Sequence, residues 1–133
     1  YYSDYLTGVS EIQSGLSSPF SLGLKGFSHT YGIALDPTDG TLFASISSRA
    51  KQSLETVTYV SGRAEPRRYL NGGQVTGDYL TFGTLKNTEY LFETISGTNQ
   101  VLVYKHNSRN PYTTLTTASS NTEGLAFKPA GVP

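Results

Sequence analysis

The chain has 133 residues, with 10 Lys and Arg against 10 Asp and Glu, so its formal net charge at pH 7 is zero. This balance argues against a nucleic-acid binder, which normally carries a basic face, and against attraction to anionic membranes. Cysteine, methionine and tryptophan are absent, which excludes disulfides, thiolate metal sites and cysteine nucleophiles. No apolar run approaches the roughly 18–20 residues that cross a bilayer. We therefore expect a soluble protein of one domain, residues 1–133.

The sequence opens on Tyr1 and Tyr2 without an initiator Met. This start indicates a processed product or an excised segment. Ser, Thr and Tyr are frequent and Lys is scarce, which is typical of the surfaces of many exported proteins. Composition thus favours an extracellular or secreted location, with any signal peptide already removed.

In chain order, the first predicted elements are three short strands. They occupy Tyr1–Tyr5, Val9–Gln13 and Phe20–Leu24. We interpret them as the second, third and fourth strands of a repeat whose first strand lies elsewhere in the sequence. The N-terminus would then begin in the middle of a repeat.

The next segment predicts a complete four-stranded unit. Its first strand, Gly32–Leu35, is followed by a turn at Asp36–Gly40, in which Pro37 presets φ and Gly40 supplies a positive φ. This turn chemistry also accounts for Asp36 and Asp39, so no cation-binding loop is expected there. The second, third and fourth strands are predicted at Thr41–Ile46, Glu55–Val60 and Arg67–Leu70.

A second complete unit follows with the same order of strands and turns. Its strands are predicted at Tyr79–Phe82, Glu89–Glu93, Gln100–Tyr104 and Tyr112–Thr116, with a turn at Gly83–Asn87. An apolar strand at Gly124–Phe127 begins a further unit. No segment shows a 3.6-residue apolar period over three turns, so an all-β fold is predicted.

Several residue types recur at one spacing, which indicates an internal repeat. Prolines at 19, 66 and 111 lie 47 and 45 residues apart, and glycines at 32, 77 and 124 lie 45 and 47 apart. Tyr59 and Tyr104, which each end a predicted third strand, lie 45 apart. We predict repeats at about 1–35, 36–80 and 81–127. A four-stranded repeat of this length is one blade of a β-propeller, and three blades are half of a six-bladed ring.

Two segments carry a resemblance to a known family. The segments 31–37 (YGIALDP) and 121–129 (NTEGLAFKP) resemble the innermost-strand signature of six-bladed propellers related to NHL repeats, senescence-marker-protein-30 (SMP-30) lactonases and streptogramin lyase. Residues 101–104 and 110–116 resemble the outer part of such blades. The resemblance covers most of the chain from about residue 19. It implies the architecture more than a function.

Three blades are few for a closed ring. Two chains around a two-fold axis would make six, and the other interpretation is that this chain is part of a longer propeller. In either case we predict that Tyr1–Tyr5 pairs with a strand Gly124–Phe127, because that strand would otherwise expose unpaired backbone groups beside an apolar face. Partners are therefore a second copy or the remainder of a longer chain. Neither nucleic acid nor membrane is expected.

Ligand sites of propellers lie where the innermost strands begin, at the mouth of the channel. The candidate ligand-binding residues there are Glu123, Asn121, Tyr31, His29, Thr76 and Asp78. The resemblance to the lactonases implies acidic and amide calcium ligands at this rim, and Glu123 matches them whereas Tyr31 and Thr76 do not. A calcium site at Glu123 and a purely structural role for it both remain open. No other cofactor is expected.

The two histidines were weighed as catalytic groups. His29 precedes an innermost strand, where it could serve as a general base or be an ordinary loop residue. His106 lies in a turn between outer strands and is expected to be solvated. Arg63, Arg67 and Arg68 form the densest basic cluster, which protects an edge strand from adventitious pairing or binds a partner.

Two functions from different classes follow. The first is a non-catalytic binding or assembly module that presents a ligand or partner site at the channel mouth. The alternative is a calcium-dependent lactonase-like hydrolase or lyase, which would need several acidic or histidine side chains converging there. A single acid and a single histidine per half-ring favour the first.

Overall fold

The computed structural model describes residues 2–4, 8–11, 18, 20–48, 54–73 and 78–118. Within these residues the chain is all-β, as predicted, and consists of three antiparallel sheets that follow one another along the sequence. The described part contains one 3-10 helix, Leu70–Gly73 (η1), and no α-helix. It also holds no helix long and apolar enough to cross a membrane.

The first sheet has three strands in the order β1-β2-β3. Ser3 pairs with Val9, and Glu11 pairs with Phe20. The order agrees with the prediction for this segment, and β3 ends three residues earlier than predicted, whereas residues 1, 5, 12 and 13 of the predicted strands lie outside the described residues. The strands are β1 (Tyr2–Asp4), β2 (Gly8–Glu11) and β3 (Phe20–Ser21).

The second sheet is a four-stranded meander in which each strand pairs with the next. Its first strand begins five residues earlier than predicted, because register shifts between Phe27 and His29 and between Thr30 and Ile33 let the pairing with β5 continue. The strands are β4 (Phe27–Leu35), β5 (Leu42–Ser48), β6 (Leu54–Tyr59) and β7 (Arg68–Tyr69).

The third sheet repeats this meander. The predicted turn at Gly83–Asn87 was too long, because the hairpin turns on two residues only. Lys86 and Asn87 have φ values of 49° and 62°, the left-handed conformation that matches the twist of a tight hairpin. The strands are β8 (Leu80–Leu85), β9 (Thr88–Thr94), β10 (Gln100–Lys105) and β11 (Thr113–Thr116).

Two apolar layers lie between the sheets. Strand β5 contributes to both of them, because alternate residues of a strand face opposite sides of its sheet. In β5, Leu42, Ala44 and Ile46 join a layer with Val9 of the first sheet. Phe43 of the same strand points the other way, into a layer formed with the third sheet. That second layer contains Phe43, Leu70, Leu80, Leu91, Leu102 and Tyr104.

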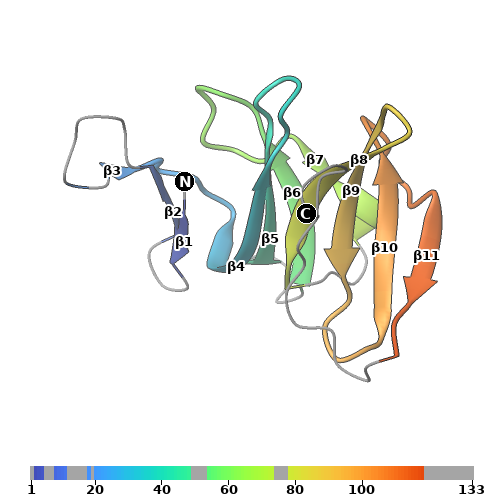
Figure 1. The fold of residues 1–133 in the computed structure, drawn as a ribbon. Coiled ribbons are helices and arrows are strands. Elements are labelled where there is room, and N and C mark those ends of the chain that lie inside the picture. Colours follow the sequence, from blue (N-terminus) through green and yellow to red (C-terminus); the bar gives the residue numbers. More distant parts are fainter. Residues whose placement is uncertain are drawn as a thin grey trace.

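Strand β4 lies at the centre of the arrangement, against β1 on one side and β8 on the other. The outermost strands β3 and β11 lie at opposite sides of the molecule (Figure 1). A Cβ on Gly32 would lie 2.2 Å from the backbone oxygen of Asp78, so this glycine permits the close approach of β4 to the chain entering β8. This close approach explains why a glycine stands at position 32, which is one of the three periodic glycines. Gly77 and Gly124 lie outside the described residues.

Candidate functional site

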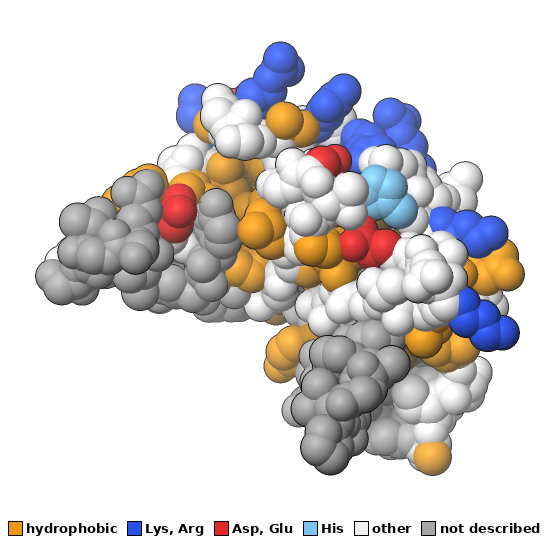
Figure 2. Space-filling view, turned by 45° about the horizontal axis from the view of Figure 1, so that its top comes forward, with side chains coloured by type: hydrophobic (Ala, Val, Ile, Leu, Met, Phe, Trp, Pro, Cys, Tyr) orange, Lys and Arg blue, Asp and Glu red, His pale blue; other side chains and the backbone are white. Residues whose placement is uncertain are grey.

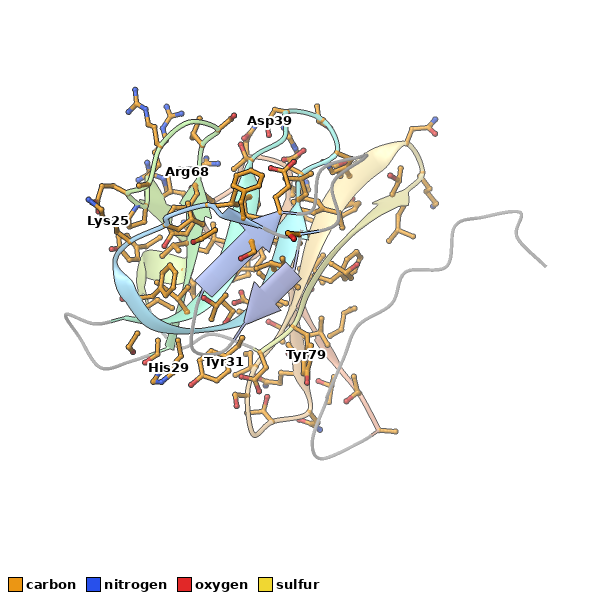
Figure 3. All side chains as sticks on the ribbon, turned by 90° about the vertical axis from the view of Figure 1, so that its left-hand side faces the viewer. Lys25, His29, Tyr31, Asp39, Arg68 and Tyr79 are labelled. Carbon is orange, nitrogen blue, oxygen red and sulfur yellow. The ribbon has the colours of Figure 1, made fainter. Side chains whose placement is uncertain are left out.

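The predicted ligand rim lies only partly within the described residues. Thr76, Asn121 and Glu123, the predicted metal ligand, lie outside them. His29 and Tyr31 belong to β4 and do not form a loop before it, because the strand extends back to Phe27. His29, Tyr31 and Tyr79 nevertheless lie toward one end of the sheets, and Asp39 and Arg68 lie toward the other (Figure 3).

Hydrogen bonds to Thr94 hold the backbone of Tyr79 at the start of β8. The N–H of Tyr79 donates to Thr94 Oγ1 at 3.2 Å, and its carbonyl accepts the N–H of Thr94 at 3.1 Å. Gly32 lies against Asp78, so the chain beside Tyr31 and the start of β8 come together. Tyr79 itself is 41% exposed. The side chains of His29, Tyr31 and Tyr79 thus lie toward this end of the molecule.

A different group of ionisable side chains converges at the opposite end. The Asp36 carboxylate accepts hydrogen bonds from the N–H groups of Thr38 at 2.8 Å and Asp39 at 3.4 Å, which confirms the predicted turn. The Asp39 carboxylate accepts the N–H of Thr41 at 2.9 Å. Hydrogen bonds from the N–H and the hydroxyl of Thr41 lower the pKa of Asp39, and His106 and Arg68 add smaller electrostatic contributions.

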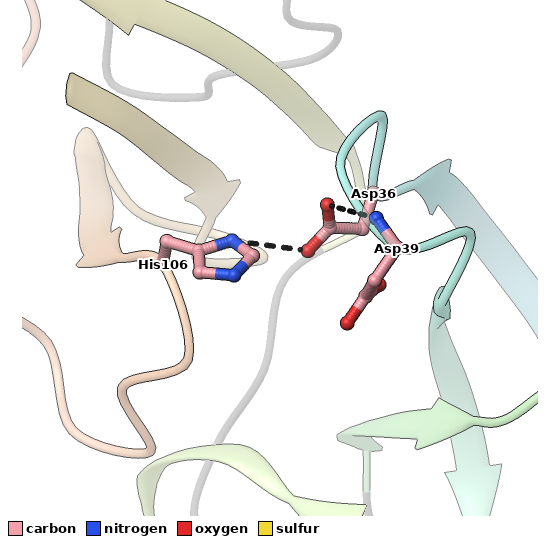
Figure 4. Close-up of side chains that lie close together, drawn as sticks. All are labelled: Asp36, Asp39 and His106. Carbon is pink, nitrogen blue, oxygen red and sulfur yellow. Dashed lines mark hydrogen bonds and ion pairs between the residues drawn. The ribbon is translucent and has the colours of Figure 1, made fainter. Parts of the chain in front are cut away.

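The expectation that His106 is solvated was wrong. Its Nδ1 atom lies 3.2 Å from Asp36 Oδ2 (Figure 4). The same atom lies 3.1 Å from Glu89 Oε1, and the His106 side chain is 30% exposed. Glu89 also accepts from Thr38 Oγ1 at 3.4 Å. His106 follows β10, whereas Asp36 follows β4, so the contact ties the second sheet to the third.

This cluster is the metal-compatible arrangement within the described residues. Oxygen and nitrogen atoms of Asp36, Asp39 and His106 all lie within 4.8 Å of one another. The ion pairs and turn bonds already account for these positions. The predicted order of strands could have placed these residues at one end of the molecule, because the turns after the first and third strands of a meander lie at the same end of its sheet. The sequence does not show which turns of neighbouring sheets meet.

A carboxylate is also buried between the second and third sheets. Glu93 accepts hydrogen bonds from Thr56 Oγ1 of β6 and from the hydroxyl of Tyr104, the latter at 2.9 Å. Glu93, Thr56 and Tyr104 are almost fully buried. Burial raises the pKa of Tyr104, and the neighbouring carboxylate raises it further. This is a structural link between sheets, which the sequence analysis missed because Glu93 resembled an ordinary strand residue.

No family model, no curated protein and no solved structure matches this chain.

Proposed function

We propose that the protein is a non-catalytic binding and assembly module of the β-propeller type, in which two copies of the chain complete a six-bladed ring. Two four-stranded meanders and a three-stranded sheet succeed one another, and β4 and β8, the first strands of the meanders, lie in contact. Blades of a propeller meet in this way, with first strands inside and fourth strands outside. The resemblance of residues 31–37 and 121–129 to six-bladed propellers supports the same architecture.

The edge of β1 is the observation that carries the proposal. The first sheet has three strands beside two sheets of four, and within the described part of the chain β1 pairs only with β2. An open edge presents unpaired N–H and C=O groups, which readily accept another strand. We assign that place to the segment Gly124–Phe127 of a second copy, because closure within one chain would bend three blades into a full circle.

The ring would have its ligand or partner site at the end where His29, Tyr31 and Asp78 lie. Two copies would bring two of each residue to one channel, together with Thr76, Asn121 and Glu123. The paired phenols and imidazoles suit recognition of a polar ligand through stacking and hydrogen bonds. Hydrolysis would need several carboxylates there, and Asp78 is the one that the structure describes beside Gly32.

Solution mass tests the assembly directly. Light scattering should give twice the 14.4 kDa of one chain. Ser3→Pro and Asp4→Pro are made separately, because neighbouring residues of a strand direct their N–H groups to opposite edges. One of them then blocks the outer edge of β1 while keeping its bonds to β2, and that variant should fall to the mass of one chain.

The matched controls lie in β11, the edge strand at the other side. Thr114→Pro and Leu115→Pro should leave the mass unchanged. A wild-type mass of one chain at every concentration would overturn the assembly, since the ring needs a second copy. A calcium titration of metal-stripped protein addresses the catalytic alternative. Heat of binding that Glu123→Gln abolishes would favour the calcium-dependent lactonase-like enzyme instead.

A further inference from the structure

A polar pocket lies at the end of the second and third sheets that carries the Asp36 turn. Its volume is about 290 Å³, and its wall includes three arginines from two segments far apart in the sequence. Basic side chains gather along the upper edge of the face shown in Figure 2. The pocket is lined by Asp39, Thr41, Thr58, Val60, Arg67, Arg68, Asn107 and Arg109.

The arginines are held in place by the backbone around them. The N–H of Arg67 donates to the carbonyl of Thr58 at 2.8 Å, and Arg68 pairs with Thr58 across β6 and β7. Arg68 Nη1 lies 3.5 Å from the carbonyl oxygen of Asn107. The carbonyl of Arg109 accepts the N–H of Asn71 in η1 at 2.7 Å. The guanidinium group of Arg68 is thus anchored, and backbone hydrogen bonds set the positions of Arg67 and Arg109 around the same cavity.

The lining of the pocket also includes a residue with an unsatisfied buried hydroxyl group. Thr58 is 0% exposed, and its Oγ1 atom has no hydrogen-bond partner. An unsatisfied buried hydroxyl is costly, so such groups are normally paired. Because this hydroxyl is shielded from solvent, the guanidinium N–H groups are the donors that an anion in the pocket can meet.

The charge of the pocket defines the class of ligand. Three arginines against the single carboxylate of Asp39 leave a net charge of about +2, which matches the −1.5 to −2 of a phosphomonoester at neutral pH. Asp39 already accepts from Thr41, and its other acceptor positions suit a hydroxyl group of the ligand. We propose that this pocket binds a small phosphomonoester that carries hydroxyl groups, such as a sugar phosphate.

The volume favours a small molecule over a macromolecule. A cavity of about 290 Å³ is near the lower limit of small-molecule sites, which range from about 300 to 1,000 Å³. The site lies at the opposite end from His29 and Tyr31 (Figure 3), so it is separate from the proposed rim. It also lies away from the β1 edge, so it does not depend on the proposed assembly.

Calorimetry on the full chain with glucose 6-phosphate, inorganic phosphate and glucose tests the site. We expect heat of binding with the two phosphates and none with glucose. Arg68→Gln should weaken both by about tenfold or more, because it removes a charge-assisted donor. Arg63→Gln is the matched control, since Arg63 lies in the same connection but outside this pocket, and it should leave both affinities unchanged.

Two further variants separate binding from folding. Thr58→Val should raise the melting temperature of the ligand-free protein, because it removes an unsatisfied buried hydroxyl, and should leave phosphate binding unchanged, because that hydroxyl is shielded from the pocket. Asp39→Asn should tighten inorganic phosphate by removing a repelling charge, and should lessen the advantage of glucose 6-phosphate over it. Equal losses from Arg63→Gln and Arg68→Gln would mean unspecific charge attraction. That outcome, or no binding of either phosphate at millimolar concentration, would overturn the proposal.

Discussion

Replacing Tyr104 with Phe removes a single hydroxyl group from the interior between the second and third sheets. That hydroxyl donates to Glu93 Oε2 at 2.9 Å, and both side chains are almost fully buried. The ring of Tyr104 keeps its packing in the apolar layer, so the substitution isolates the hydrogen bond. Thr56 remains as a donor to the other carboxylate oxygen.

The expected loss follows from the kind of bond. A hydrogen bond to a charged group contributes about 1.5–3 kcal/mol, and its loss leaves a buried oxygen with one donor fewer. We expect Tyr104→Phe to lower the free energy of unfolding by about 2 kcal/mol. For a chain of this size that corresponds to a melting temperature lower by about 7 °C.

Tyr59 is the matched control that the repeat itself supplies. It lies 45 residues earlier, near the end of the corresponding strand, and is equally buried. Its hydroxyl donates to the backbone carbonyl of Lys25 at 2.8 Å, a neutral acceptor at an exposed residue. Tyr59→Phe should therefore cost only about 1 kcal/mol.

Urea unfolding at neutral pH measures both variants, with unchanged m-values as the sign that only stability has changed. In a Glu93→Gln background the cost of Tyr104→Phe should fall to about 1 kcal/mol, because the charged acceptor is gone. Equal costs for the two tyrosines, or an unchanged cost in the Glu93→Gln background, would refute a charge-assisted bond between Glu93 and Tyr104.

Three other predictions follow from the packing. Gly32→Ala should lower the free energy of unfolding by about 3 kcal/mol, because the new Cβ would meet the Asp78 backbone. Gly23→Ala has open space around it but a φ of 62°, so it should lower the free energy of unfolding by only about 1 kcal/mol. Thermal unfolding compares the two variants, and equal losses would contradict the close approach of Gly32 to Asp78. Burial raises the pKa of Tyr59 and of Tyr104 above the ordinary 10.0, so the stability contributed by their neutral hydroxyls is fully present below pH 10. Above pH 10 the free energy of unfolding should fall by up to about 1.4 kcal/mol per pH unit for each tyrosine, because the unfolded chain then releases protons that the folded chain keeps. Urea titrations across that range should show a smaller decrease in the free energy of unfolding for Tyr59→Phe than for the unchanged protein. Deleting residues 1–5 should convert the proposed dimer into a monomeric or aggregating species, and a truncated protein that keeps its mass and melting temperature would refute the closing strand.

The sequence by itself determined the strands and their order. Short runs rich in β-branched and aromatic residues, divided by turn residues, predicted eleven strands that the structure contains. The spacing of Tyr59 and Tyr104 placed corresponding strands of the two meanders correctly. These features are local, so a short window of residues carries them.

Only the tertiary structure decided which side chains meet between the sheets. The pairing of His106 with Asp36 joins residues 70 positions apart, and the Arg68–Arg109 pocket joins two sheets at their ends. Register shifts in β4, which drew His29 and Tyr31 into a strand, depend on pairing with β5 over a distance in sequence. Local patterns specify which residues form a strand and which face they share. They do not specify the lateral position of one sheet on the next, because that position is set by the shape and packing of both faces together.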